Sequence, residues 1–193
     1  MSNTLPLFQQ YTPYDTKIVK TATRYGLDLI GGTAIDLLCR YYSIPFWRSR
    51  SNNDLDFWTT YDNNHKDRFI RHIKSTLGFV VKEDSDYMLS LESLTIHTDT
   101  DILIDYDRNN SKFGYTANDI KVMSPIYLFA SKFDRYVNCN NVQRKTTDFK
   151  DLQTLLLLIE RTNGFDELEN HLSALNYDQR AEDALNDIIT SMI

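Results

Sequence analysis

A change of sequence pattern near residue 124 limits the folds open to this chain more than any other feature. Before it, short apolar segments with the alternation of strands lie between segments with helical spacing. After it, the spacing is helical, and Ser124-Pro125 is a typical helix start because proline suits the first helical position. The pattern predicts a mixed α/β (α+β) domain at residues 1–122. A C-terminal helical bundle at 123–193 is expected to pack on it.

The expected elements of the first part alternate between helix and strand. Helices are expected at 17–24, 33–43 and 65–77, and strands at 27–30, 54–60, 79–82, 87–91 and within 94–106. Thr33 is expected to cap the second of these helices. In the second part, helices are expected at 125–137, 147–161, 166–175 and 178–192.

Composition and charge exclude several classes of protein. Eight acidic and two basic residues between Glu160 and Ile193 account for the whole net charge of −6, so no overall positive field attracts nucleic acid. The longest apolar run, Leu155–Ile159, is too short for a membrane span, and the first residues lack a signal-peptide pattern. Two cysteines form no disulfide framework, and the scattered histidines show no zinc-ligand spacing. We therefore expect a soluble, cytoplasmic protein with no membrane partner.

A glycine pair is the first feature that could carry chemistry. Gly31-Gly32-Thr33 lies between an expected strand and an expected helix. Paired glycines allow a sharp turn that brings backbone N–H groups close to an anion, and a helix start adds partial positive charge. The segment is therefore a candidate phosphate site, although the same residues are also consistent with a plain tight turn.

An acidic pair follows on the next expected strand. Asp54 and Asp56 are separated by one residue, so on a strand both side chains point to the same face. Two carboxylates on one face can share Mg²⁺, which prefers oxygen ligands. The alternative is an exposed polar strand edge at which both groups are solvated.

A third acid is expected on a later strand. Residues 101–105 have an apolar centre, with Asp101 and Asp105 on one face and isoleucines on the other. A carboxylate on a core strand is costly unless it is paired or bound to metal. Either aspartate is therefore a candidate third carboxylate.

The order of these features resembles the nucleotidyltransferase superfamily, which has a glycine pair at a strand–helix turn followed by an acid-x-acid strand. Two segments look more narrowly like the abortive-infection (AbiEii-like) nucleotidyltransferase toxins. They are LIGGTAI at residues 29–35 and RSNNDLDF at residues 50–57. That family also has a lysine on a later helix and a following acid, which would be Lys132 and Asp148 here, with Asp151 as the alternative acid. The family's Ser or Thr two positions before the first Asp is Asn52 in this chain.

The resemblance implies a nucleotidyltransferase-like mixed sheet and a set of site residues. Mg²⁺ or Mn²⁺ would be held by Asp54, Asp56 and Asp101. The implied catalytic residues are Asp54, Asp56, Asp101, Lys132 and Asp148, and the nucleoside triphosphate would be bound by Gly31, Gly32, Thr33, Arg50, Ser51 and Lys132.

Lys132 and Asp148 also allow structural interpretations. Lys132 follows Leu128 by one helical turn in an apolar stripe, so its ammonium either faces a triphosphate or extends to water. An unpaired buried ammonium is costly, and the anions expected to accompany it without substrate are Asp54, Asp56 or Asp101. Asp148 could instead be an acid near a helix N-terminus, where the helix dipole favours it.

The sequence therefore predicts a metal-dependent nucleotidyltransferase that moves a nucleoside monophosphate from a nucleoside triphosphate to an acceptor hydroxyl. The resemblance implies a toxin of a toxin–antitoxin or abortive-infection system, with the 3′ end of tRNA as acceptor and a separate antitoxin as partner. Two alternatives stay open. One is an aminoglycoside-type antibiotic nucleotidyltransferase, and the other is a non-catalytic nucleotide-binding or interaction protein on the same fold.

Overall fold

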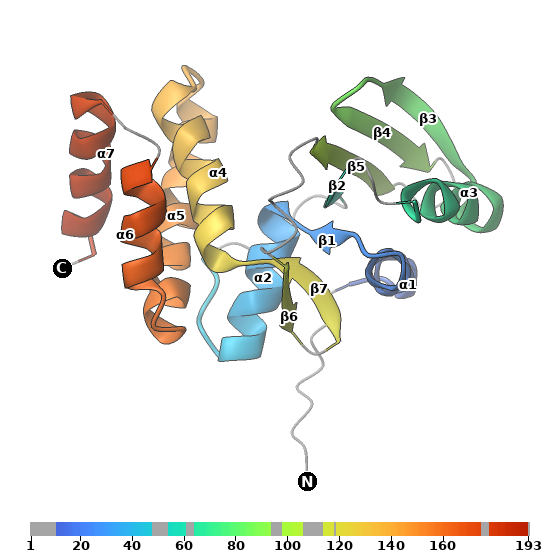
Figure 1. Cartoon of the computed structure of the whole chain (residues 1–193), viewed down its shortest axis with the longest axis horizontal. Coiled ribbons are helices and arrows are strands. Elements are labelled where there is room, and N and C mark those ends of the chain that lie inside the picture. Colours follow the sequence, from blue (N-terminus) through green and yellow to red (C-terminus); the bar gives the residue numbers. More distant parts are fainter. Residues whose placement is uncertain are drawn as a thin grey trace, which may run out of the picture.

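The computed structural model describes residues 11–47, 54–60, 64–93, 98–105, 114–117, 119–174 and 178–192. Its centre is a seven-stranded sheet in the order β3-β4-β5-β2-β1-β7-β6 (Figure 1). The β2–β5 and β1–β7 pairs are parallel, and the other neighbouring strands are antiparallel. The strands are β1 Asp28–Leu29, β2 Leu55–Thr60, β3 Phe79–Asp84, β4 Met88–Ser93, β5 Thr98–Asp105, β6 Gly114–Ala117 and β7 Ile120–Met123. The predicted α/β class with a mixed sheet is confirmed.

Helices lie on both sides of this sheet. Helices α1 and α3 contact each other on one side, while α2 lies between the sheet and the helices that follow β7 (Figure 1). Among these later helices, α4 and α5 pack against each other, and both contact α2. The helices are α1 Pro13–Arg24, α2 Gly31–Tyr42, α3 Lys66–Leu77, α4 Pro125–Asn138, α5 Val142–Arg161, α6 Phe165–Ala174 and α7 Gln179–Thr190. No helix in the described ranges is long and apolar enough to cross a membrane.

The alternation of β2 sets the direction of the acidic pair. Leu55 and Phe57 are fully buried, and the Phe57 ring meets the Phe69 ring of α3 edge-on at 5.7 Å between centroids. Because successive strand residues face opposite ways, Asp54 and Asp56 point away from α3. Burial of the apolar face thus fixes the acidic face, as the sequence predicts.

Helix starts differ from expectation where a cap was misread. Ile30, not Thr33, is the N-cap of α2, which begins two residues earlier at Gly31. The Thr33 hydroxyl instead donates to the Asp54 carbonyl at 3.2 Å and ties α2 to the start of β2. Helix α5 starts five residues earlier than predicted because the Asn141 side chain accepts from the N–H of Arg144 and caps it. Strands β6 and β7 were not predicted.

Candidate functional site

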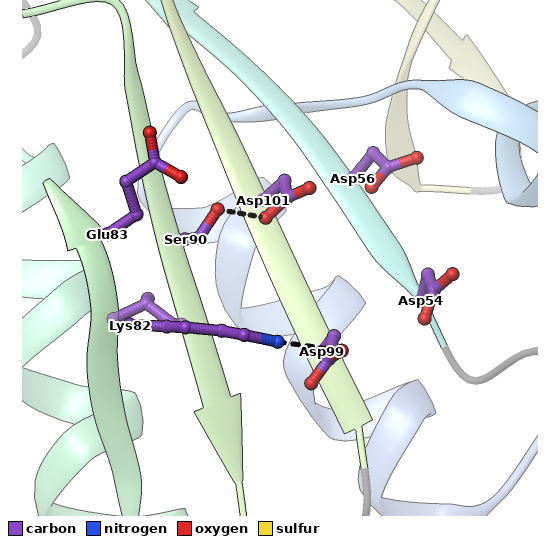
Figure 2. Close-up of a pocket in the computed structure, with 8 residues that line it drawn as sticks. Asp54, Asp56, Lys82, Glu83, Ser90, Asp99 and Asp101 are labelled. Atoms are coloured by element: carbon purple, nitrogen blue, oxygen red, sulfur yellow. Dashed lines mark hydrogen bonds and ion pairs between the residues drawn. The ribbon is translucent and has the colours of Figure 1, made fainter. Parts of the chain in front are cut away.

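A polar row crosses four neighbouring strands on the face away from α3. Strand register places Glu83 opposite Ser90, Ser90 opposite Asp101, and Asp101 opposite Asp56. Figure 2 shows Ser90, Asp101 and Asp56 on adjacent strands, with Asp54 just before the first residue of β2. We call Asp54, Asp56 and Asp101 the acidic cluster.

Register also separates the two candidates for the third carboxylate. The parallel pairing of β2 with β5 puts Asp101 beside Asp56, whereas Asp105 lies beside Thr60. Four residues along a parallel strand correspond to about 13 Å. The structure therefore brings Asp101 to the acidic pair and leaves Asp105 farther along the strand.

A pocket of about 250 Å³ opens over the acidic cluster (Figure 2). Besides the three aspartates, its walls come from β3, β4 and β5, and they are more acidic than basic. Lys82 and Asp99 form an exposed ion pair in this wall, with 3.8 Å between the ammonium nitrogen and a carboxylate oxygen. The lining residues are Asp54, Asp56, Lys82, Glu83, Ser90, Leu91, Asp99 and Asp101.

An irregularity in β3 shapes this wall. The register of β3 against β4 shifts between Val81 and Glu83, as in a β-bulge. Regular alternation would send Lys82 and Glu83 to opposite faces, but both line the pocket. The bulge therefore turns a cation and an anion of the edge strand toward the acidic cluster.

The acidic cluster is crowded with like charge. Burial, and then the negative charges of Asp101 and Asp54, raise the pKa of Asp56 to about 6, while Lys132 and Arg135 act in the opposite sense. Carboxylates that repel each other in this way favour a bound proton or a cation.

The donor set fits a hard divalent cation, because three carboxylates offer the oxygen ligands that Mg²⁺ and Mn²⁺ prefer. The described residues do not, however, bring three His, Cys, Asp or Glu side chains into a ready-made metal site. A metal held by Asp54, Asp56 and Asp101 therefore stays a prediction.

The start of α2 is pressed against Asp56. Gly31 has φ +70°, and a Cβ added there would lie 2.4 Å from the Asp56 carboxylate oxygen Oδ2. The Ile30 N–H also donates to the Asp56 carbonyl at 2.9 Å. A glycine is required at position 31 both for its backbone angle and for the space that the carboxylate takes. The start of α2 thus lies next to the acidic pair, with Gly31 against the Asp56 carboxylate, Thr33 hydrogen-bonded to the Asp54 carbonyl, and Gly32 between them in the chain.

Two predicted nucleotide-binding residues, Arg50 and Ser51, lie outside the described residues.

Lys132 has partners other than those expected. Its side chain is 8% exposed, so the interpretation in which it extends to water is wrong. Its ammonium lies 2.7 Å from Asp151 and 3.5 Å from Asp148, and the described contacts include no ion pair to the acidic cluster. The expected pairing with Asp54, Asp56 or Asp101 is therefore wrong.

Asp148 and Asp151 are both fully buried between α4 and α5. Because α5 begins at Val142, Asp148 stands in its second turn, so the interpretation as an acid at the helix N-terminus is also wrong. Burial is the largest single influence on Asp148 and raises its pKa, but hydrogen bonding and charge from Arg135 and Lys132 together hold that pKa below its usual value.

Sequence reasoning missed two residues that complete this group. Arg135 donates to both oxygens of Asp148, through Nε to Oδ2 at 2.8 Å and through Nη2 to Oδ1. The Trp47 indole N–H donates to Asp151 at 2.9 Å. Arg135 follows Lys132 by three positions, which places both cations on one helix face and could have been read from the sequence. We call Lys132, Arg135, Asp148 and Asp151 the buried ion network.

Comparisons with known proteins address the fold. No protein-family model matches the chain, and no curated protein matches it in sequence. Among solved structures, the antibiotic-resistance factor ANT(2'')-Ia in solution matches with a TM-score of 0.56 and 16% identity, over 92% of this chain and 95% of that chain. ANT(2'')-Ia in complex with adenylyl-2''-tobramycin matches with a TM-score of 0.58 and 16% identity, over 82% and 92%. The chain has a nucleotidyltransferase-like fold.

A third neighbour agrees with this fold. It is an antigenic nucleotidyltransferase-like protein from Paracoccidioides brasiliensis, with a TM-score of 0.50 and 11% identity, over 92% of this chain and 88% of that chain. Identities this low show a common fold and nothing finer. The resemblance of two sequence motifs to AbiEii-like toxins stays a prediction.

Proposed function

We propose that this protein is a metal-dependent nucleotidyltransferase that moves a nucleoside monophosphate from a nucleoside triphosphate to an acceptor hydroxyl. The observation that supports it best is the position of three aspartates from two paired strands against the start of α2, where Asp56 takes the space beside Gly31. Phosphates carry the charge that helix N–H groups attract, and divalent metal ions held by the three aspartates would supply positive charge to neutralise them.

The reaction forms one bond and breaks one. The acceptor oxygen bonds to the α-phosphorus, the bond from that phosphorus to the bridging oxygen breaks, and pyrophosphate leaves. Bound Mg²⁺ or Mn²⁺, held by Asp54, Asp56 and Asp101, would supply neutralising charge for the phosphates. The backbone at Gly31, Gly32 and Thr33 would hold the triphosphate.

Two groups of side chains have further roles in this proposal. Asp101 stands on the pocket side of Asp56 and would take the proton of the acceptor hydroxyl. Lys132 and Arg135 lower the pKa of Asp56, so their positive charge reaches the site and would favour negative charge on the leaving pyrophosphate.

The acceptor has two candidate classes. The motif resemblance favours the 3′ end of tRNA and a toxin role with a separate antitoxin. A specific observation favours a second class, because Glu83 extends the acidic pocket to β3, and the lining as a whole has five carboxylates against the single ammonium of Lys82, which would attract an amine-bearing polyol. An aminoglycoside is such a compound, and ANT(2'')-Ia, whose fold is similar, was solved with adenylyl-2''-tobramycin.

One assay tests the proposal and separates these classes. The protein is incubated with each of the four nucleoside triphosphates labelled at the α-phosphate, with Mg²⁺, and in turn with total tRNA, cell protein and aminoglycosides. We expect label on one acceptor class, loss of transfer with a chelator, and at least about a thousandfold slower transfer by Asp56→Asn. If the wild-type protein binds a triphosphate but labels none of these acceptors, the non-catalytic alternative is favoured. Normal transfer by Asp56→Asn would show that the site is wrong.

A further inference from the structure

Ser90 is the one neutral polar side chain in the row from β3 to β2 described above. It lies in the middle of β4, is 9% exposed, and faces the pocket between Glu83 and Asp101. Its hydroxyl donates to Oδ1 of Asp101 at 2.6 Å (Figure 2). A hydroxyl has one proton to donate, and here that proton is given to a carboxylate of the acidic cluster.

This hydrogen bond makes the two carboxylate oxygens of Asp101 different from each other. Oδ1 is occupied by Ser90, and the described residues give Oδ2 no donor. The carboxylate can therefore turn only at the cost of a short hydrogen bond to a charged group, which is among the stronger kinds in proteins. Asp101 presents one fixed oxygen to the space that it shares with Asp56.

We propose that Ser90 is a positioning residue, which holds Asp101 in the orientation that binds a divalent cation together with Asp56 and takes the acceptor proton. The inference rests on the proposed function and adds to it a residue from a strand that carries none of the predicted site residues. Ser90 touches neither substrate nor metal in this role, because its hydroxyl acts through Asp101.

The same strand offers a matched control. Ser93 lies three residues along β4 on the opposite face, is fully buried, and donates to the Leu77 carbonyl at the end of α3 at 2.9 Å. Its hydrogen bond holds elements together and does not contact the acidic cluster. Ser93→Ala therefore reports what the loss of one buried serine hydroxyl from β4 does to the fold alone.

The experiment compares Ser90→Ala, Ser90→Thr and Ser93→Ala with the wild type in the full chain. Mn²⁺ binding is measured by calorimetry without nucleotide, and then kcat and KM for the triphosphate are measured with the acceptor found in the assay above. We expect Ser90→Ala to bind Mn²⁺ about tenfold more weakly and to lose about tenfold in kcat, with KM for the triphosphate within about twofold. Ser90→Thr keeps the hydroxyl and should stay within about threefold of the wild type in both.

The control separates positioning from a general effect on the fold. Ser93→Ala should lower the melting temperature but leave Mn²⁺ affinity and kcat unchanged. The proposal is overturned if Ser90→Ala binds Mn²⁺ as the wild type does, if Ser90→Thr is as weak as Ser90→Ala, or if wild-type protein binds no Mn²⁺. Because the Mn²⁺ titration needs no turnover, a wild type that binds Mn²⁺ but transfers no label would contradict the proposed function and still give a clear answer on Ser90.

Discussion

The acidic cluster on the sheet and the buried ion network between α4 and α5 both gather carboxylates, but they balance charge in opposite ways. On the sheet, burial and like charges raise the pKa of Asp56 to about 6. Between the helices, the buried carboxylate of Asp148 meets two cations, and its pKa is held below the usual value. On the sheet, the named carboxylates raise one another's cost of ionisation, whereas between the helices the two carboxylates and two cations of the network sum to zero charge. The acidic cluster would gain from binding a cation, and the buried ion network holds two helices together.

The largest expected effect comes from breaking the balanced network. Asp148→Ala would leave Arg135 without the carboxylate that accepts both of its hydrogen bonds, whereas Lys132 would keep Asp151 at 2.7 Å. Removal of one partner from a buried pair typically costs about 3–5 kcal/mol, and the 40% exposure of the Arg135 side chain places this variant near the lower end. We expect a loss of that size in the free energy of unfolding, measured by urea denaturation. Glu160→Ala, an exposed acid on the same helix, should change it by less than about 0.5 kcal/mol. A small change in Asp148→Ala would show that the network contributes little to the fold.

The next effect tests which acids make up the unbalanced site. Asp101→Asn should slow nucleotidyl transfer at least about a hundredfold, about 2.7 kcal/mol of transition-state stabilisation, because Asp101 lies beside Asp56. Asp105→Asn, on the same face of the same strand but beside Thr60, should stay within about threefold. Equal losses in both variants would contradict the assignment by register.

A third variant tests whether the Lys132 ammonium, which belongs to the buried ion network, also acts on the acidic cluster. Lys132→Met keeps an apolar stem and removes the ammonium that lies between Asp148 and Asp151. We expect about a tenfold loss of turnover, about 1.4 kcal/mol, because the positive charge that reaches the site falls. The variant should also unfold more easily, since Asp151 then loses the ammonium that lies 2.7 Å from its carboxylate. Turnover is therefore measured well below the melting temperature, and unchanged turnover would confine Lys132 to a structural role.

Local patterns on single elements were sufficient to predict most of the fold. The alternation of Leu55 and Phe57 with acids predicted β2 and its faces, and Ser124 with Pro125 predicted the start of α4, where the Ser124 hydroxyl accepts from a backbone N–H. Strands β6 and β7 were not predicted because each has only four residues, too few to show a clear alternation of apolar and polar positions.

Relations between elements could not be read in the same way. The choice of Asp101 over Asp105 depends on the register of two strands far apart in sequence, which the alternation of either strand leaves open. The partners of Lys132 depend on how α4 packs on α5. Ser90 carries no motif, and only its pairing with β5 brings it to Asp101.

The smallest effect concerns stability against pH and sharpens the comparison most directly. The folded-state pKa of Asp56 is about 6, above the usual value of 3.8, so the folded protein holds this proton more tightly than the unfolded chain does. As pH rises from about 4 to about 6, the unfolded chain releases the proton first, and the stability of the metal-free protein falls. Asp56→Asn removes this penalty, so its advantage in the free energy of unfolding should be near zero at pH 4. Above pH 6 it should reach about 1–3 kcal/mol, the upper limit set by about two pKa units.

The measurement is urea denaturation of both proteins from pH 4 to 8 with a chelator present. Both proteins share the other titrating groups, so the difference between them reports the cost of ionising Asp56, to which burial contributes most and the charges of Asp101 and Asp54 contribute next. A difference that does not change with pH, or a less stable variant at pH 8, would contradict the raised pKa of Asp56.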